Sequence, residues 1–428
     1  DATITNEGWE FIEEKLPYLH AMIPSEVVRI GHITAQGNLR SNSTQGNITL
    51  DIDSDAGTIQ ARANIDNKGY YTTHITGKDI NIAKAIPTSP LTRTDIILQA
   101  EGTITDMQSL LSGKQGLTIP TGTFKGMATQ TILMGYEYKN IQLNGAYSPH
   151  IYSGKIAIDD PNGQLNLQAR YDESQLQPQY TAQIVADSIN LHALNLIDIH
   201  EGRSFSARLN GNIKGKQFNH MTGSIKIDSL TMHREGDDYS INSIALYSFE
   251  SETKTLSLNS DFMNAAVKGD FTYQTIMRSL LAHLHDYLPS LCPSHNHRHI
   301  TSSNQCLVDL QIKDTEPLKE LLLIPISIDK TASIVAQFYD ESRSVGLDIQ
   351  IPQLTYNGND LANVVLQCKT NGHKAEIQGQ GSLYNDDTHI AATLQATAKE
   401  DKLSIGALWQ SNPADFFTGA FSTDVFFA

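Results

Sequence analysis

The sequence predicts an almost entirely β protein, made of many short antiparallel strands. Apolar and polar residues alternate with a period of two along many segments, which is typical of strands with one apolar and one polar face. Turn signals rich in Gly, Asn, Asp and Pro separate these segments. Only two longer segments have apolar residues at helical spacing. Strand propensity and the two-residue periodicity therefore both predict a mainly β fold.

The alternating segments are short and numerous. The clearest of them span residues 48–52, 58–65, 155–158, 164–169, 224–227, 255–258, 347–351 and 390–396. Turn signals stand at residues 55–57, 66–69, 160–163, 235–238, 357–358 and 371–373. We estimate about thirty strands, which at roughly 4.8 Å each would extend one sheet to on the order of 140 Å. Such a sheet must curl, split in two or close on itself.

Two segments, 6–22 and 273–288, are predicted to be short amphipathic helices. Each precedes a new run of strands and contains a similar Leu-Pro-containing phrase. Two shorter helical turns at 106–111 and 316–322 each precede an Ile-Pro pair, at 119–120 and 324–325. This weak internal repeat predicts two helix-initiated β segments, 1–271 and 272–428. We interpret the helices as covers for exposed sheet edges; a plug at the end of a groove and a contact with a partner or membrane are the alternatives.

The charge balance excludes several classes of partner. The 428 residues include 31 basic and 47 acidic ones, for a net charge of −16. Nucleic-acid binding needs a basic face, and docking on an anionic membrane needs a basic patch. The longest apolar run, 321–326, is too short to span a bilayer, and the chain opens with Asp. We therefore expect a piece of a larger protein whose anchor and targeting segments lie elsewhere.

No catalytic constellation is found in the sequence. Nucleophile-elbow and phosphate-loop motifs do not occur. The carboxylate pairs Asp159-Asp160, Asp237-Asp238 and Asp386-Asp387 fall in turns, where Asp usually caps the local backbone. We therefore expect a protein that is not an enzyme and that needs no cofactor.

A histidine cluster invites comparison with a metal site. It comprises His283, His285, His295, His297 and His299, near Cys292 and Cys306. Imidazole and thiolate are good zinc or copper ligands. The alternating polar segment 294–299 lies among Pro and Ser residues, which favours an exposed loop, so we expect no metal site. A single Cys292–Cys306 bridge and three free thiols, with Cys368 as the third, both fit the cysteine count.

The apolar faces of the strands are aliphatic and poor in aromatic residues, and most Tyr residues lie near turns or strand ends. Acyl chains would favour such a lining, but an ordinary β core looks the same. An open groove and a closed β-sandwich therefore both remain; a propeller would need a regular repeat, which is missing. The candidate lining residues are Ile48, Leu50, Ile52, Ile59, Ile65, Ile156, Ile158, Leu165, Leu167, Ile225, Ile227, Leu256, Leu258, Ile349, Ile351, Ile390 and Leu394.

A recurring phrase carries a family resemblance. It consists of a short strand, a Gly, a polar turn and another strand, and it occurs at 98–104, 207–215 and 377–383. The stretch 262–271 ends in Val-Lys-Gly-Asp-Phe and leads directly into the second predicted helix. Over most of its length the chain resembles the AsmA-like superfamily, and more closely the large TamB-like proteins of Bacteroidetes-type envelopes. It corresponds to a middle fragment of such a protein.

The resemblance implies a fold, a location and a function. TamB-like proteins are anchored in the inner membrane, cross the periplasm and form a long, curved, taco-shaped sheet with a greasy groove. They are linked to phospholipid transport towards the outer membrane and to outer-membrane assembly with an Omp85-class partner. The expectation is thus a non-enzymatic periplasmic conduit for phospholipid acyl chains, membrane-associated through segments outside this chain. A structural or adhesive β-sandwich that binds glycan or protein is the alternative.

Overall fold

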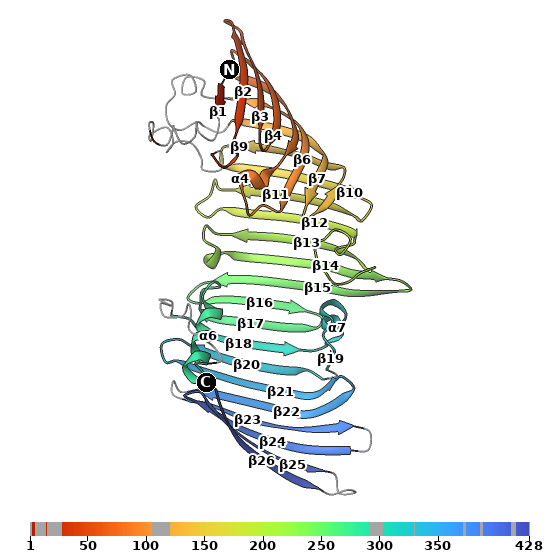
Figure 1. Cartoon of the computed structure of the whole chain (residues 1–428), viewed down its shortest axis with the longest axis vertical. Helices are drawn as coiled ribbons and strands as arrows, with labels where there is room; N and C mark the ends of the chain where they lie inside the picture. Colours follow the sequence, from red (N-terminus) through yellow and green to blue (C-terminus); the bar gives the residue numbers. More distant parts are fainter. Residues whose placement is uncertain are drawn as a thin grey trace. The chain divides into compact units, whose positions relative to one another are not determined.

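The chain is mainly β, as predicted (Figure 1). A computed structural model describes residues 2–4, 14, 28–104, 120–290, 303–328, 330–370, 374–385, 388–411 and 417–427. These residues contain 26 strands of an open antiparallel sheet, close to the estimate of about thirty. The chain divides into two compact units: Asp1–Asn212 with Ser229–Ser240, and Ile213–Asp228 with Ile241–Ala428. We call them unit 1 and unit 2.

Unit 1 is a run of strands joined mostly by tight turns. Its strands are β1 (Ala2–Ile4), β2 (Ile33–Ser41), β3 (Gln45–Ser54), β4 (Gly57–Asp66), β5 (Tyr70–Ile80), β6 (Leu91–Thr103), β7 (Thr121–Leu133), β8 (Tyr136–Tyr138), β9 (Ile141–Ser148), β10 (Ile151–Asp160), β11 (Gly163–Asp172), β12 (Gln179–Ile189) and most of β13 (Ser204–Lys214). The only helix with described bounds in this unit is α4 (Ile82–Ala85), which the sequence did not predict.

Unit 2 repeats the same plan and adds two helices. Its strands are β15 (Asp237–Glu250), β16 (Lys254–Ser260), β17 (Met263–Asp270), β18 (Gln305–Ile312), β19 (Ile326–Ser327), β20 (Ala332–Tyr339), β21 (Ser344–Tyr356), β22 (Asn359–Thr370), β23 (Ala375–Asn385), β24 (Thr388–Lys399), β25 (Lys402–Ser411) and β26 (Thr418–Phe426). Both β14 (Thr222–Arg234) and β15 include residues of each unit. The helices are α6 (Ile276–Tyr287) and α7 (Glu316–Leu322), and Phe218–His220 forms one 3-10 turn.

Two of the four helical predictions are confirmed. The segment predicted at 273–288 forms α6, and α7 has the predicted bounds. The predicted helix at 6–22 and the turn at 106–111 lie outside the described residues, apart from Glu14, as do Cys292 and residues 294–299. No helix within the described ranges is long and apolar enough to cross a membrane. The proposed boundary at residue 271 stays a prediction.

The turns form as their sequences predict. In the turn at 160–163, Asp160 Oδ1 accepts a hydrogen bond of 2.9 Å from the backbone N–H of Asn162. The phenol of Tyr136 donates to the same oxygen at 2.6 Å. Gly163 completes the turn at a φ of +140°, where a side chain would be strained. Asp160 thus caps local backbone, as expected for a carboxylate in a turn.

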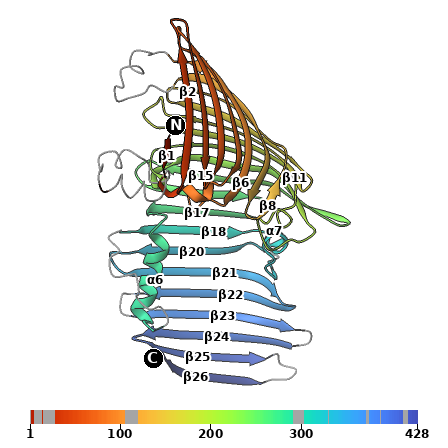
Figure 2. The same cartoon turned by 45° about the horizontal axis from the view of Figure 1, so that its top comes forward.

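Little of the molecule is fully buried, because each unit is largely one layer of sheet. The buried hydrophobic residues are few and scattered, with Met232 (0% exposed) the largest fully enclosed side chain. The helix α6 provides most of the organised packing in unit 2, where it crosses the ends of several strands (Figure 2). We had expected the helix to cover an edge strand. It lies instead on a face of the sheet, so that interpretation was wrong.

Candidate functional site

The register of unit 1 places its apolar side chains on a single face. Residues directly paired in an antiparallel ladder point to the same side of the sheet. Strand-by-strand pairing joins β2 to β12 without changing sides. One row across seven of these strands contains Ile75, Leu98, Gly126, Leu143, Ile156, Leu167 and Ile184. We call this side the apolar face of unit 1.

All nine lining residues predicted in unit 1 lie on this face. They are Ile48, Leu50, Ile52, Ile59, Ile65, Ile156, Ile158, Leu165 and Leu167. Ile52 pairs with Ile59, and Leu143 and Leu167 flank Ile156 on its two sides. None of the nine is buried: eight are half-buried, and Ile48 is 45% exposed. A closed core would enclose such side chains, whereas these remain accessible. Their role as a lining is compatible with this accessibility and stays a prediction.

Unit 2 has an equivalent apolar face. Ladder partners connect six predicted residues there: Leu256, Leu258, Ile349, Ile351, Ile390 and Leu394. Five are half-buried and Leu394 is 36% exposed. Ile225 and Ile227 are half-buried too; they are two residues apart on β14 and so share one side of that strand.

The opposite side of unit 1 is polar. One row across it contains Arg62, His74, Gln99, Lys125, Asn144, Lys155 and Gln168, without an acidic residue. A hollow of about 490 Å³ lies between Arg62, His74 and Lys125, and one of about 360 Å³ lies beside Asn144 and Lys155. In unit 2 a hollow of about 670 Å³ is lined mainly by the polar sides of β23 to β26. These three hollows, formed by described residues, therefore lie mainly on the polar sides.

A row of tyrosines borders the apolar face of unit 1. It comprises Tyr71, Tyr147, Tyr152, Tyr171 and Tyr180, on β5, β9, β10, β11 and β12. Ladder partners connect them, through Gly102 on β6 and Gly122 on β7. This row, the tyrosine row, thus contains only Tyr and Gly across seven strands.

The two glycines of this row make room for the rings. A Cβ at Gly102 would lie 2.8 Å from Tyr71 Oη, and one at Gly122 would lie 2.7 Å from Tyr147 Oη. The two phenols lean over these strands from either side and hydrogen-bond to each other. Further along, the rings of Tyr152 and Tyr171 stack at 6.1 Å, and those of Tyr171 and Tyr180 are 4.9 Å apart. The contacts therefore form two groups, Tyr71 with Tyr147 and Tyr152 with Tyr171 and Tyr180, which the ladder pair of Tyr147 and Tyr152 joins.

The surroundings of Tyr71 and Tyr171 keep these two phenols protonated. Burial, and then the hydrogen bond with Tyr147, raise the pKa of Tyr71 above its usual value. A hydrogen bond of 2.8 Å to Glu173, together with burial, raises the pKa of Tyr171 to about 12. The single hydroxyl hydrogen of Tyr171 is therefore held by Glu173.

In unit 2 the helix α6 covers the corresponding border of the apolar face. Phe271, Cys306 and Phe338 form a buried cluster with Ile276 of the helix packed against it. At the other end of α6, Tyr287 packs with Leu288, Ala375 and Ala398. Burial raises the pKa of Cys306, and that of the half-buried Cys368 on the same face. Both are therefore protonated thiols at neutral pH, with little nucleophilic character.

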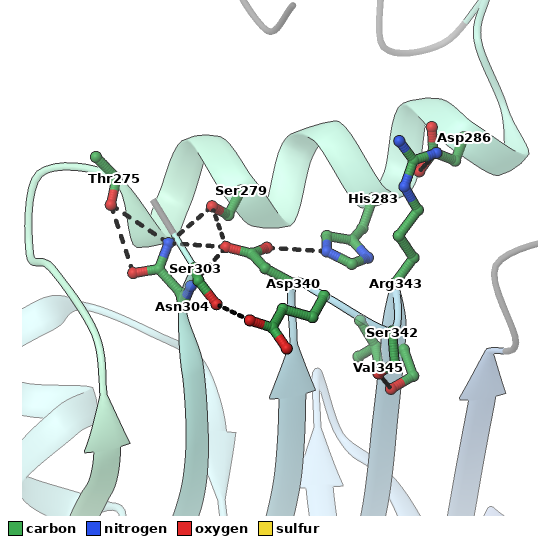
Figure 3. Close-up of polar contacts among 12 residues, drawn as sticks. Thr275, Ser279, His283, Asp286, Ser303, Asn304, Asp340, Ser342, Arg343 and Val345 are labelled. Atoms are coloured by element: carbon green, nitrogen blue, oxygen red, sulfur yellow. Dashed lines mark hydrogen bonds and ion pairs between the residues drawn. The ribbon is translucent and has the colours of Figure 1, made fainter. Parts of the chain in front are cut away.

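A polar network anchors this helix, as Figure 3 shows. Asp340 Oδ2 accepts hydrogen bonds from Ser279 Oγ (3.0 Å), the backbone N–H of Asn304 (2.8 Å) and Asn304 Nδ2 (3.1 Å). Asp340 Oδ1 lies 3.0 Å from His283 Nε2. Ser279 and Asn304 are each 1% exposed and His283 is 5% exposed. We call these four residues the anchor network.

The anchor network contains Ser, His and Asp but is not arranged for catalysis. In a hydrolytic triad the His lies between the Ser and the Asp and takes the proton of the Ser. Here Ser279 and His283 both bind to Asp340, on different oxygens, and Ser279 also accepts from Asn304 Nδ2 at 2.8 Å. Ser279, His283 and Asn304 are buried between helix and sheet, and the side chain of Asp340 is 15% exposed. Their arrangement fixes the position of the helix.

The described residues contain no group of three ligands suited to a metal ion. Of the histidine cluster, His283 belongs to the anchor network and His285 lies on the same helix, while His295, His297 and His299 lie outside the described residues. The absence of a metal site stays a prediction for that segment.

Sequence reasoning missed the tyrosine row and the anchor network. The signal for the tyrosine row was present, because its Tyr residues lie at strand ends opposite Gly-containing strands. Assembling them requires the register, which alternation alone does not give. In the anchor network, 61 residues separate Ser279 from Asp340, and no local pattern connects them.

Comparison of the chain with protein-family models, curated proteins and solved structures found no match in any of the three.

Proposed function

We propose that this protein is a non-enzymatic lipid carrier of the cell envelope, whose apolar faces shield phospholipid acyl chains from water. The observation that carries the proposal is the continuous apolar face from β2 to β12, none of whose nine predicted lining residues is buried. Soluble proteins rarely leave a contiguous apolar surface of this kind without a ligand or partner.

Carrying acyl chains requires no chemical reaction. Burial of each CH₂ contributes about 0.8 kcal/mol, so that a chain gains free energy at any position along the face. Neighbouring rows of unit 1 present similar Ile and Leu side chains on successive strands. A surface of many equivalent weak sites suits movement of a lipid better than one tight site does.

The cellular setting belongs to the same proposal. It rests on the resemblance to TamB-like proteins, which implies a periplasmic location, an anchor in the inner membrane and an Omp85-class partner at the outer membrane. Movement of phospholipid between the two membranes, or assistance to outer-membrane assembly, would follow from such a location. Copurification of the full-length protein with an outer-membrane partner tests this part separately.

The first experiment is native mass spectrometry and lipid extraction after gentle purification. We expect bound phospholipid, and binding of a dye that fluoresces on apolar surfaces, in the absence of denaturant. Absence of bound lipid together with absence of dye fluorescence would contradict the proposal.

Matched substitutions test where the lipid lies. Ile156→Asp, Leu167→Asp and Ile227→Asp place a charge among half-buried aliphatic side chains, and we expect each to reduce lipid retention while the protein stays folded. Asn166→Asp adds the same charge to the polar side of β11, next to Leu167, and should retain lipid. Unfolding by any one of the first three would place that residue in a sealed core instead.

A second candidate function uses the polar sides. The hollows beside Arg62, His74 and Lys125, and beside Lys155, present amide and cationic groups that could bind a glycan or an acidic segment of a protein. Binding to a glycan array or a partner that is lost in Arg62→Ala/Lys125→Ala and unaffected in Leu167→Asp would favour it.

A further inference from the structure

The tyrosine row has more hydroxyl groups than the packing of the sheet requires. Rings that lie over glycines of neighbouring strands stabilise a sheet, which accounts for the rings of Tyr71 and Tyr147. That role needs a ring but not a hydroxyl. Tyr152 pairs with Tyr147 and Tyr171 and not with a glycine. Its phenol needs another explanation, whereas the phenol of Tyr171 donates to Glu173 at 2.8 Å.

The hydroxyls lie where an apolar surface changes to a polar one. On β10, Tyr152 is followed on the same face by Gly154, Ile156 and Ile158; on β11 the corresponding order is Tyr171, Ala169, Leu167 and Leu165. Each strand therefore runs from a phenol to bulky aliphatic residues over about 20 Å, at 3.3 Å per residue. A membrane lipid has the same order of groups, from its polar linkage to its acyl chain.

Two hydroxyl hydrogens of the row can be donated to a ligand. In the Tyr71–Tyr147 pair one hydroxyl donates to the other, which leaves the second hydrogen available. The hydroxyl of Tyr152 has no protein partner within the described ranges. The row itself contains no Lys or Arg, so it matches a neutral acceptor such as an ester carbonyl better than a phosphate.

We infer that the tyrosine row binds the ester linkage of a diacyl phospholipid whose acyl chains lie on the adjoining aliphatic rows, and thereby fixes the orientation of the lipid on unit 1. The inference rests on the proposed function and extends it. The row crosses seven strands about 4.8 Å apart, or roughly 29 Å, with hydrogens available at the Tyr71–Tyr147 pair and at Tyr152. The lipid can move from one strand to the next while its polar end stays at the same border.

Two photoreactive phosphatidylethanolamine probes test this orientation. One carries a diazirine beside the glycerol esters, the other at the end of an acyl chain. After irradiation of the purified chain with each probe, mass spectrometry maps the labelled residues. We expect the first probe to label the ends of β9 to β12 that bear Tyr147, Tyr152, Tyr171 and Tyr180. The second should label the parts of the same strands that bear Leu143, Ile156 and Leu167.

The variant Tyr152→Phe keeps the ring and removes one hydroxyl. It should lose the preference of the first probe for the tyrosine row by about fivefold, the effect of one net hydrogen bond, while total labelling changes little. Tyr70→Phe is the matched control, because Tyr70 lies on the polar side of β5, where its phenol donates to Glu101 at 2.8 Å. It should leave both labelling patterns unchanged.

The outcomes separate this inference from the proposed function. If both probes label the tyrosine row and the aliphatic rows equally, or if Tyr152→Phe keeps the wild-type preference, the orientation is wrong and the lipid-carrying function stands. Labelling confined to the polar side, or absent with both probes, would overturn the proposed function and the orientation together.

Discussion

The two units treat the border of an apolar face in different ways. In unit 2 the helix α6 lies over the border and buries Phe338 and Cys306. In unit 1 the described residues place a row of tyrosines there, with two hydroxyls joined over a pair of glycines. In a single-layer amphipathic sheet, apolar side chains at each border lie next to water and must be covered or replaced by amphipathic ones. A helix covers them, whereas tyrosines offer an apolar ring and a polar tip.

This difference predicts unequal costs of truncating an aromatic or aliphatic side chain. Phe338→Ala opens a cavity beneath α6 and should lower the free energy of unfolding of unit 2 by about 3–5 kcal/mol. Leu167→Ala on the open face of unit 1 should cost roughly 1–2 kcal/mol, because Leu167 is only half-buried. Denaturant unfolding, with hydrogen exchange to resolve the units, measures both. A larger cost for Leu167→Ala would mean that the face of unit 1 is enclosed.

The enclosure by α6 depends on the anchor network. Asp340→Ala removes the acceptor for Ser279, Asn304 and His283, and leaves buried donors unpaired. We expect a loss of about 2–3 kcal/mol and faster amide exchange in α6. The control is Asp286→Ala on the same helix, which breaks a 3.4 Å ion pair with the exposed Arg343 and should cost under about 1 kcal/mol. Equal effects of the two substitutions would show that the network does not hold the helix.

The glycines beneath the tyrosine row offer a test of close packing in unit 1. A Cβ at Gly122 would lie 2.4 Å from the carbonyl oxygen of Glu101, so Gly122→Ala must displace a strand and should cost about 1–3 kcal/mol. At Gly154, which lies on the same face one row further in, the nearest atom would be 3.7 Å away. Gly154→Ala should be neutral or stabilise by up to about 1 kcal/mol. Thermal unfolding of the two variants decides whether the rings pack as described.

The smallest expected effect is on stability at alkaline pH. The pKa of Tyr171 is raised to about 12, mainly by its hydrogen bond to Glu173. Because the folded state holds this proton more tightly than the unfolded state does, the contribution to stability is complete below about pH 10. It is lost as the pH rises from about 10 towards 12. Tyrosinate absorbance should show late titration of one phenol, and Glu173→Gln should shift it to lower pH.

Sequence reasoning reached the strands but not their assembly. Alternation at 48–52 and 164–169 falls within β3 and β11, and helical spacing located α6 and α7, because both periodicities are local properties of the chain. The one-turn helix α4 has too few residues to show a period. The contact between Tyr71 and Tyr147, which are 76 residues apart, depends on turn lengths and on the register of the strands between them. The position of α6 on a face depends on contacts with Asn304 and Asp340, which its own sequence does not reveal.

Nearly every strand within a unit pairs with the strands before and after it in the sequence; the short strands β8 and β19 are exceptions. Folding can therefore begin at many of the hairpins and spread outwards, as in solenoid repeat arrays, since most closures span only a short loop. The same connectivity makes the sheet extensible. Insertion of one hairpin adds two strands, about 9.6 Å of width, and preserves which side of every other strand is apolar. Proteins built on this plan can thus change their reach by duplication of a hairpin without redesign of the rest.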